Sequence, residues 1–505
     1  MDSNALPLIL TFLPLLGAIL VFLLPGKSEG DAATPLWRLA QVIGLLTFLV
    51  SIPVWTSFDP GEAGSQFRFT ADWFQVHGLQ THFDMGIDGL SILLVMLTTL
   101  IMALVFFSAR SHVKIRDREF LTWLLIMESG MLGVFMALDF FLFFVFWEVM
   151  LVPLYFVIGI WGGKRRLYAS YKFVLYTMAG SVLMLLAILW LTAMPIQVPG
   201  RGLAMSSDIL LHAQYAAINP AIQTWLFLAF AIAFLIKVPA LPFHTWLPDA
   251  HVEAPTSGSV ILAGVLLKMG TYGLIRFCLP IFPDATRFFA PWLMGIGAAG
   301  VVYGAYLAWA QGDMKKLVAY SSISHLGYIV LGTFALNQQG LEGSVIQMVS
   351  HGVATPALFL LVGYVYEQRH TRAISEYGGI AKVMPRYAFF LMMATFASVG
   401  LPGLSGFIGE FTILLGSFLA NRPMAIIAAF GVIFGAVYML SMVRRVIFGP
   451  IKNDENKKLV DLNLRQCLIL VPLVILFVWI GVFPTTFTSK TTKTLQTIEA
   501  RVNPR

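Results

Sequence analysis

Charged residues are scarce in this 505-residue sequence. Asp, Glu, Lys and Arg make up 12% of it, hydrophobic residues make up 58%, and the mean hydropathy is +0.81. A water-soluble protein needs more polar surface than this, so the composition excludes a soluble globular fold. Cysteine is scarce as well. Cys278 and Cys467 stand alone in apolar surroundings, which excludes a C-x-x-C metal or redox motif, and we expect both to be inert packing residues.

Cofactor motifs are also missing. The sequence contains no P-loop and no cluster of candidate iron or haem ligands, so no motif predicts that this chain binds a nucleotide or a redox cofactor. The formal net charge of +7 does not indicate nucleic-acid binding, because the basic residues lie in short loops between apolar runs.

The sequence is rich in apolar runs of about 20 residues, the length that an α-helix needs to cross a bilayer. Such runs predict an all-α polytopic membrane protein rather than a barrel. The first run lacks a preceding basic region and a following cleavage site, so we expect a first span and not a signal peptide. We predict about fourteen spans, near residues 5–24, 37–57, 88–108, 119–137, 140–162, 171–194, 223–245, 256–279, 289–310, 317–336, 343–366, 386–420, 424–443 and 466–484.

Most Lys and Arg residues fall in the loops that follow odd-numbered spans. Since cytoplasmic loops carry the excess of basic residues, both termini are predicted to lie away from the cytoplasm. The loop 246–255 is cytoplasmic on this scheme, although it has no Lys or Arg. On the opposite side, apolar and polar residues partly alternate over residues 67–74, which predicts a β-hairpin that turns at residues 77–78. The tail after residue 485 is polar, and we expect no long amphipathic helix in it.

Two apolar runs carry a lysine near the middle, Lys237 and Lys268. Placing a lysine at mid-bilayer depth costs about 2.5–3.5 kcal/mol on insertion scales, and such residues usually face the protein interior and pair with another group. Pro239 and Pro242 follow Lys237, and each removes a helical hydrogen bond, so the seventh span is predicted to break there. A broken helix beside a buried lysine is tolerated where it lines a hydrated path.

A second break is predicted in the twelfth span, at the Gly- and Pro-containing residues 400–406, shortly before Glu410. The two broken spans are five spans apart, and an odd offset means that they cross the membrane in opposite directions. Paired broken helices in two halves of inverted topology indicate an ion path. We therefore expect four regions: an N-terminal three-helix segment with the hairpin (1–118), two inverted five-helix repeats (119–280 and 281–450), and a C-terminal loop, span and tail (451–505).

Other ionisable residues within apolar runs are candidates for the same path. Glu148 is the expected partner of Lys237, because a nearby carboxylate lowers the cost of burying an ammonium group. Glu410 follows the second break directly. His325 and His351 are either packed, hydrogen-bonded residues or proton carriers, since histidine titrates in the range that a proton relay needs.

Two further groups stay open at this level. Glu128 lies in the middle of an apolar run without an evident partner. The loop after the seventh span holds a polar cluster of His244, Asp249, His251 and Glu253. This cluster is either a proton funnel on the cytoplasmic side or a structural feature of the loop, and its His-x-Glu spacing resembles a metal site only superficially.

Four sequence blocks resemble the antiporter-like membrane subunits of respiratory complex I, NADH:quinone oxidoreductase. They are FFVFWEVMLVPLYFVIGIWGG, KVPALPFHTWLPDAHVEAPTSGSVILAGVLLKMGTYGL, QGDMKKLVAYSSISHLGY and GLPGLSGFIGEF. The likeness extends over nearly the whole chain. It implies fourteen helices, two inverted five-helix repeats and a central hydrophilic axis of Glu148, Lys237, Lys268, His325 and Glu410, with His351 nearby. Glu410 and the short tail favour the branch of the family that has a glutamate in the twelfth span and no long lateral helix.

The resemblance also implies an activity. We expect proton translocation driven by redox chemistry in partner subunits, which would hold NADH, FMN, iron–sulfur clusters and quinone, with no cofactor in this chain. The expected partners are the lipid bilayer and other membrane subunits, including antiporter-like neighbours, but not nucleic acid. The expected location is a bacterial inner membrane. Two alternatives stay open: a subunit of a multi-subunit sodium/proton antiporter or membrane-bound hydrogenase, and a structural spacer whose buried charges only hold the two halves in register.

Overall fold

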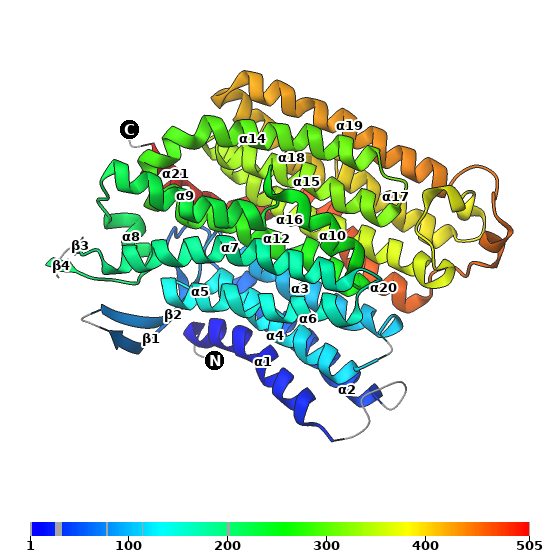
Figure 1. The fold of residues 1–505 in the computed structure, drawn as a ribbon, viewed down its shortest axis with the longest axis horizontal. Helices are drawn as coiled ribbons and strands as arrows, with labels where there is room; N and C mark the ends of the chain where they lie inside the picture. Colours follow the sequence, from blue (N-terminus) through cyan, green and yellow to red (C-terminus); the bar gives the residue numbers. More distant parts are fainter. Residues whose placement is uncertain (1–2, 26–32, 77–78, 114, 199–201, 504–505) are drawn as a thin grey trace.

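Long helices aligned in one direction form most of the structure, a computed structural model that describes residues 3–25, 33–76, 79–113, 115–198 and 202–503 (Figure 1). Within these residues, twelve helical segments are long and apolar enough to cross a membrane. This confirms the prediction of an all-α polytopic membrane protein. The segments are Leu6–Leu23 (α1), Thr34–Ser57 (α2), Ile92–Ser111 (containing α3, Ile92–Ser108), Asp117–Met136 (α4), Phe140–Trp161 (α5 and α6), Arg166–Ala193 (α7), Pro220–Lys237 (α9), Thr256–Ile281 (α11 to α13), Pro283–Trp309 (α14), Gln338–Arg369 (α16), Arg422–Val446 (α19) and Leu464–Val482 (α20).

Two of the predicted spans are not among these segments. The first is α15 (Met314–Thr333), which forms the expected helix near 317–336 but is less apolar. The second is the run 386–420, which folds into two shorter helices, α17 (Pro385–Val399) and α18 (Ser405–Ala420). The total of fourteen spans and the inverted repeats stay predictions.

Both predicted helix breaks are present. α9 ends at Lys237, and the chain continues through a short 3-10 turn into α10 (Trp246–Glu253). α17 and α18 are separated by residues 400–404, where Gly400 and Gly403 take positive φ angles of 79° and 90°, a region that glycine adopts readily. Non-helical backbone at membrane depth is tolerated only where protein or a polar cavity surrounds it.

A third break, in the fifth span, was not predicted. The span divides at Met150 into α5 (Phe140–Val149) and α6 (Leu151–Trp161). Pro153 explains the division, because proline has no N–H to donate to the carbonyl of Val149, four residues earlier. The break places Glu148 at the end of a helix rather than in the middle of one.

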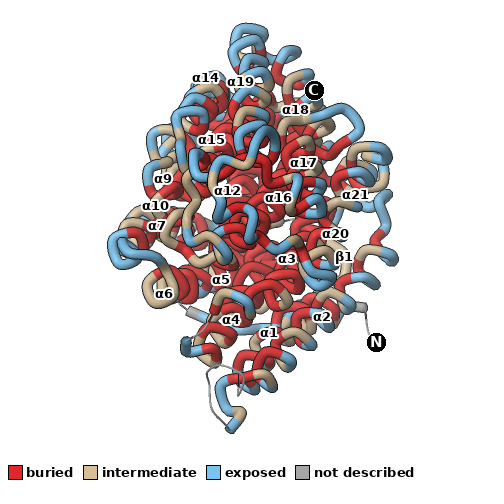
Figure 2. The backbone as a smooth tube through the Cα atoms, turned by 90° about the vertical axis from the view of Figure 1, so that its right-hand side faces the viewer, coloured by how far each residue is buried: buried red, intermediate tan, exposed pale blue. Residues whose placement is uncertain are grey.

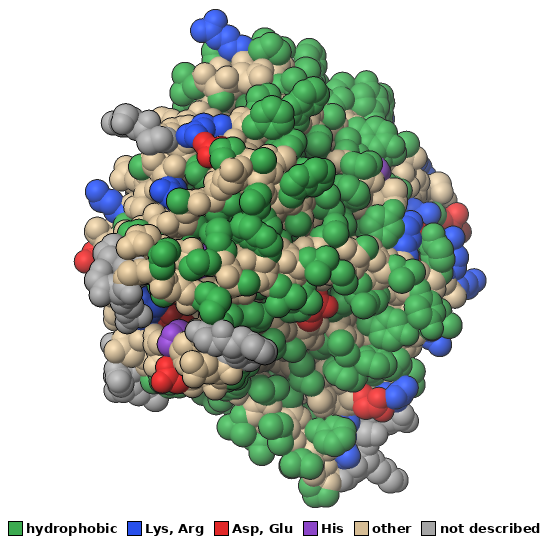
Figure 3. Space-filling model, turned by 60° about the vertical axis from the view of Figure 1, so that its left-hand side comes forward, with side chains coloured by type: hydrophobic (Ala, Val, Ile, Leu, Met, Phe, Trp, Pro, Cys, Tyr) green, Lys and Arg blue, Asp and Glu red, His purple; other side chains and the backbone are tan. Residues whose placement is uncertain are grey.

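The surface is divided into an apolar belt and two polar ends. Figure 3 shows hydrophobic side chains over a broad central band, with charged side chains gathered toward the two ends. The apolar side chains exposed on α7, α19 and α20 include Leu175, Ile433 and Leu468. In the centre of the bundle, the most apolar 18-residue stretches of α16 and of the eighth span (256–281) are 100% buried (Figure 2). The interior helices are therefore the ones that carry Lys268 and His351.

The G-x-G-x-x-G spacing of residues 295–300 has a packing role. In dinucleotide-binding folds this pattern lies between a strand and a helix, whereas here it lies inside α14. A β-carbon at Gly297 would come within 2.7 Å of the Leu331 backbone nitrogen. The glycines therefore let α14 and α15 approach each other closely.

A β-hairpin forms in the loop before the third span, as predicted. β1 (Gln66–Val76) pairs antiparallel with β2 (Leu79–Ile87), while the turn predicted at 77–78 lies outside the described residues. A second, smaller hairpin, β3 (Ile196–Val198) and β4 (Gly202–Ala204), was not predicted. Both hairpins, α8 (Ile209–Tyr215) and the two ends of the chain lie at one end of the bundle (Figure 1).

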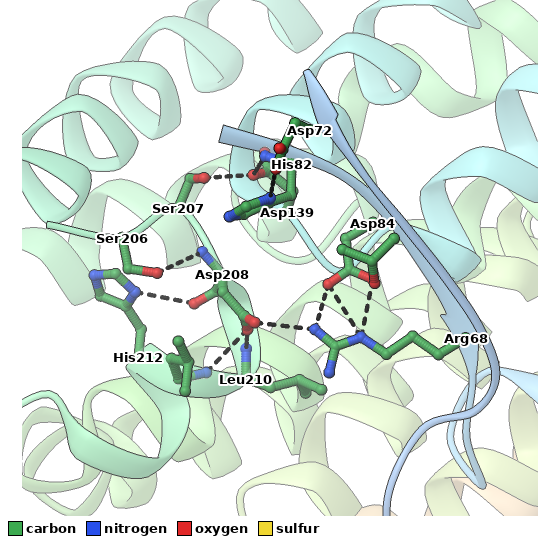
Figure 4. A network of polar contacts seen from close by, with 12 residues as sticks. Arg68, Asp72, His82, Asp84, Asp139, Ser206, Ser207, Asp208, Leu210 and His212 are labelled. Atoms are coloured by element: carbon green, nitrogen blue, oxygen red, sulfur yellow. Dashed lines mark hydrogen bonds and ion pairs between the residues drawn. The ribbon is translucent and has the colours of Figure 1, made fainter. Parts of the chain in front are cut away.

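A polar network fastens the larger hairpin to this end of the bundle (Figure 4). Arg68 on β1 forms ion pairs with Asp84 on β2 and with Asp208, which caps α8. Nearby, Asp139 caps α5 and accepts a hydrogen bond from Ser207. The hydrogen bond from Arg68 to Asp84 raises the pKa of the guanidinium, and burial raises the pKa of the Asp139 carboxyl. The start of α5 is thus anchored outside the membrane-spanning region.

The polar tail folds as an amphipathic helix, contrary to the prediction. α21 (Thr485–Val502) buries Phe487, Thr491, Leu495 and Ile498, among others. Their spacing of three or four residues gives the helix one buried face. The prediction failed because part of this face is threonine, so the apolar stripe is thin. Packing against the bundle, rather than hydrophobicity, selects the helix.

α21, which we call the strap, lies across the end of the bundle that carries the hairpins (Figure 1). Lys490 donates a hydrogen bond to the carbonyl of Trp55 at 2.9 Å, at the end of α2. Asn503, just after the strap, donates to the carbonyl of Leu336 at 2.7 Å, just after α15. One helix therefore holds both the N-terminal segment and the second half of the chain.

Replacing Leu495 in the strap by alanine should destabilise the protein by about 2–5 kcal/mol, because the side chain is fully buried and its removal leaves a cavity. The measurement is the thermal unfolding midpoint of the detergent-solubilised protein. Gln496→Ala, at the adjacent exposed position, is the control and should leave the midpoint within error. Equal midpoints for the two variants would contradict a holding role for the strap.

Candidate functional site

Lys237 lies at the break of the seventh span, with 2% of its surface exposed. Its ammonium is 3.9 Å from the sulfur of Met150 and 5.0 Å from the centre of the Trp147 ring, which is within cation–π range. Glu148 lies between these two residues in the chain, and its charge attracts the ammonium. Among the described residues, however, the buried Glu148 Oε1 has no hydrogen-bond partner. The predicted partnership is therefore an attraction through space and not a contact.

Lys268 lies in the eighth span between two wider, π-helical turns. The span consists of α11 (Thr256–Ile261), α12 (Leu267–Gly273) and α13 (Leu279–Ile281), separated by π-helical turns at 262–266 and 274–278.

The Lys268 side chain is fully buried. Its ammonium donates to the carbonyl of Ala263 and lies 2.6 Å from His351 Nδ1. π-Turns inside helices are frequent at functional sites, and here they flank the residue that contacts a histidine of another helix.

His351 on α16 connects Lys268 to the second helix break. Its ring lies 5.6 Å from the ring of His325 on α15. His325 Nδ1 is 2.8 Å from Glu410 Oε1 on α18, and Gln347 donates to the same oxygen at 3.0 Å. The two histidines and Glu410 are buried. Lys268, His351, His325 and Glu410 thus form a buried line with one gap, between the two histidine rings, and we call this line the relay.

A small polar cavity lies between the two histidines of the relay. Its wall includes the side chains of His325, His351, Gln347, Ser350 and Ser398. The volume is about 10 Å³, close to what one water molecule needs. Ser398 lies 3.2 Å from His325 Nε2. A single water in this cavity would bridge the gap between the two rings.

The seventh and eighth spans touch where their lysines lie. A β-carbon at Gly270 would come within 2.7 Å of the Phe234 carbonyl oxygen and 3.0 Å of the Lys237 β-carbon. The backbone of the eighth span therefore runs directly beside Lys237. The structure brings four of the six predicted site residues into one line, with a gap only between the two histidine rings, and places Lys237 and Glu148 beside that line.

Residues 137–435 match the family model described as NADH:quinone oxidoreductase/Mrp antiporter, TM. The match covers more than half of the chain and includes every relay residue. This chain belongs to that antiporter family.

Named members of the family match almost the entire chain. It is 45% identical, over 95% of its length and 93% of the relative's, to NADH-quinone oxidoreductase subunit M of Rhodobacter capsulatus. It is 41% identical, over 95% of each chain, to NADH-ubiquinone oxidoreductase chain 4 of Chondrus crispus. A chain of respiratory complex I from Thermus thermophilus has a TM-score of 0.87 and 30% identity, with 98% of this chain and 100% of that one covered. The resemblance found in the sequence blocks is confirmed.

The polar cluster expected at residues 244–253 of this antiporter-family chain does not form one group. Asp249 turns outward and pairs with Lys172 at 2.8 Å. His251 is fully buried and stacks on Phe359, with ring centres 4.7 Å apart. Neither ring nitrogen of His251 has a hydrogen-bond partner in the described part of the chain. The separation follows from α10, because residues two apart on a helix point to different faces.

A larger cavity opens at the end of the bundle opposite the hairpins. Its volume is about 720 Å³, and its wall carries charged side chains together with Phe359. The charged residues of the wall are Lys164, Glu253, Lys315, Glu367 and Arg372. Phe359 belongs both to this wall and to the His251 stack. His251 therefore lies one side chain away from the cavity, and it is within electrostatic reach of Lys268.

Sequence reasoning missed the neutral side chains that complete the relay. Gln347 and Ser398 lie in apolar runs, where uncharged polar residues are too common to be a signal. Gln347 precedes His351 by four residues, so it lies one helical turn away on the same face, and that spacing was a usable signal. The π-turns around Lys268 have no counterpart in the residue pattern.

Gly270→Ala should destabilise this antiporter-family chain by about 1–3 kcal/mol, because the new methyl group would overlap the backbone of α9. Gly435→Ala on α19 is the matched control, since a β-carbon there has nothing within 4 Å and alanine favours a helix. Thermal unfolding midpoints of the two purified variants are compared. A Gly270→Ala midpoint equal to that of the control would contradict the close contact between the two lysine-bearing spans.

Proposed function

We propose that this chain is subunit M of an NADH:quinone oxidoreductase and translocates protons across the membrane. The observation that carries the proposal is the relay, a line of buried proton-carrying groups from Lys268 to Glu410 inside an apolar bundle. The 45% identity to a subunit M over 95% of the chain favours this enzyme over the alternatives with the same fold, a sodium/proton antiporter and a membrane-bound hydrogenase.

Proton transfer along the relay requires only short steps. Lys268 contacts Nδ1 of His351, one water in the small cavity spans the distance to His325, and His325 contacts Glu410. A histidine can accept a proton on one ring nitrogen and release another from the second nitrogen. In our proposal, protons move from Lys268 to Glu410 and leave from there.

Glu148 and Lys237 are proposed to couple the relay to the rest of the enzyme. The two groups are apart in this structure, and charge that arrives from a neighbouring subunit would move them together or apart. Two unit charges 4 Å apart at an effective dielectric constant of 20 interact by about 4 kcal/mol, which is enough to change how strongly Lys237 holds its proton. Glu148 is only half-buried in the isolated chain, so a neighbour that covers α5 would act on it directly.

Protons are proposed to reach Lys268 from the large cavity. His251 stacks on Phe359 of the cavity wall and is within electrostatic reach of Lys268, and neither of its ring nitrogens has a hydrogen-bond partner among the described residues. In this proposal His251 serves proton uptake, whereas Asp249 holds the 244–253 loop in place through its ion pair with Lys172.

Partner subunits are proposed to carry out the redox chemistry. They would hold NADH, FMN, iron–sulfur clusters and quinone, and the antiporter-like L and N subunits would be the direct neighbours. The positive-inside rule supports a cytoplasmic location of the basic end of the bundle, and the proposed location of both termini is the periplasmic side of a bacterial inner membrane. The two broken spans support the division into regions 1–118, 119–280, 281–450 and 451–505, with two inverted five-helix repeats in the middle.

Lys237→Ala tests the proposed axis in the intact complex. We expect an assembled complex on a native gel, with coupled proton uptake slower by about tenfold or more, because the charge interaction of about 4 kcal/mol through which Glu148 would act on the relay is lost. Quinone reduction and proton uptake are recorded together in vesicles. Lys457→Ala, in an exposed loop, is the control. Normal pumping per electron would assign the chain the spacer role instead.

Glu148→Gln tests the coupling step separately. The amide keeps the shape of the side chain but removes its charge, so we expect coupled proton uptake to fall by about tenfold or more, with assembly unchanged. Glu148→Asp retains the charge and should recover part of the rate. Pumping at wild-type efficiency in the Gln variant would rule out the proposed coupling by charge.

A further inference from the structure

Glu128 is a buried carboxyl group that the relay does not use. It lies in the middle of α4 and is fully buried. Neither carboxyl oxygen has a hydrogen-bond partner among the residues that the structure describes. Buried polar side chains with a structural role are normally hydrogen-bonded, and the side chain next to it, Ser129, is satisfied by the carbonyl of Thr11. An unsatisfied carboxyl at this depth requires another explanation.

Contacts between α4 and the eighth span show which face of α4 is turned toward that span. The ring centres of Phe135 on α4 and Tyr272 on α12 are 5.3 Å apart, and the Tyr272 hydroxyl donates to the Phe135 carbonyl at 3.3 Å. Glu128 precedes Phe135 by seven residues, about two full turns, so it lies on the same face of α4. Lys268 precedes Tyr272 by one turn and so shares the face of the eighth span that Tyr272 presents to α4.

Helix rise gives the two side chains similar depths. Both helices run from the basic end toward the hairpin end: α4 is followed by Ala137, which pairs with Met85 of β2, and α13 ends beside the strap. Glu128 is about 10 Å below Phe135 along the helix axis. Along the axis of the eighth span, Lys268 lies about 6 Å and Ala263 about 13 Å below Tyr272. The Lys268 ammonium donates to the Ala263 carbonyl, so it lies between these two depths, a range that includes the depth of Glu128.

We propose that Glu128 is a second proton-exchange partner of Lys268. When the ammonium leaves His351 and turns toward α4, one of its N–H bonds breaks and an O–H bond forms on the Glu128 carboxylate, so that the neutral amine and the neutral carboxylic acid remain. The reverse transfer reloads Lys268 before it donates to His351. Each lysine of the axis then has its own carboxylate, Glu148 for Lys237 and Glu128 for Lys268. The flanking π-turns give the lysine-bearing segment room to rotate between the two partners. The inference depends on the proposed relay.

Two variants separate this role from packing. Glu128→Gln keeps shape and polarity, and Glu128→Met keeps volume and removes the unsatisfied oxygens, which by itself is often neutral or stabilising. In the intact complex we expect both to assemble and both to slow proton uptake coupled to NADH oxidation by about tenfold or more. Glu128→Asp should recover part of the rate. Glu119→Gln, the same change at a half-buried position in the first turn of α4, where the carboxylate pairs with Arg116, is the matched control.

A spectroscopic measurement checks that the carboxyl itself changes protonation. Redox-induced infrared difference spectra of the wild-type complex should contain a carboxylic-acid carbonyl band that shifts in D₂O, and Glu128→Gln should lack this band. Wild-type pumping in both the Gln and the Met variant, or an unchanged band in the Gln variant, would overturn the proposal.

A double variant distinguishes failure of this inference from failure of the relay. If Glu128 acts through Lys268, Lys268→Ala combined with Glu128→Gln should pump no worse than Lys268→Ala alone, because the two effects are then not additive. Normal pumping by Lys268→Ala would overturn the relay itself. Impaired pumping by Lys268→Ala beside normal pumping by Glu128→Gln would overturn only the role of Glu128.

Discussion

The cost of burying charge in an apolar bundle determines how this protein is built. Where a charge serves the architecture, it is fully paired: Arg276 makes a two-pronged ion pair with Asp88, at 2.6 and 2.7 Å, and a further hydrogen bond to Tyr272. The two lysines of the axis are different. Lys237 has no carboxylate in contact with it among the described residues, and Lys268 contacts a histidine and a backbone carbonyl. The two lysines of the axis thus differ from Arg276, which holds the scaffold together.

Much of the axis could be predicted because its residues are of types that are rare in apolar runs. A lysine in an apolar run, or a proline next to it, is unusual enough to be recognised in the sequence alone, and this was sufficient for Lys237, Lys268 and the break before Glu410. Family resemblance added the histidines. The sequence could not show that Glu148 and Lys237 would be apart, because that depends on how far two helices approach each other.

The remaining features depend on tertiary contacts that leave little trace in the residue pattern. The strap has a polar composition, and only packing against the bundle makes it a helix. The 244–253 cluster was predicted from proximity along the chain, and α10 sends its members to opposite sides. The break at Met150 is an exception, since Pro153 marks it in the sequence.

The two ends of the bundle are held together by different contacts. The strap joins loops from the N-terminal segment and from the second half at the hairpin end, and the network around Arg68 adds further crosslinks there. At the other end the halves are crosslinked through residues that line the 720 Å³ cavity: Glu367 pairs with His112 at 3.2 Å, and Arg372 donates to the carbonyl of Val252 at 3.1 Å. A movement that widens the cavity would therefore have to break these two contacts, while the strap keeps the hairpin end closed.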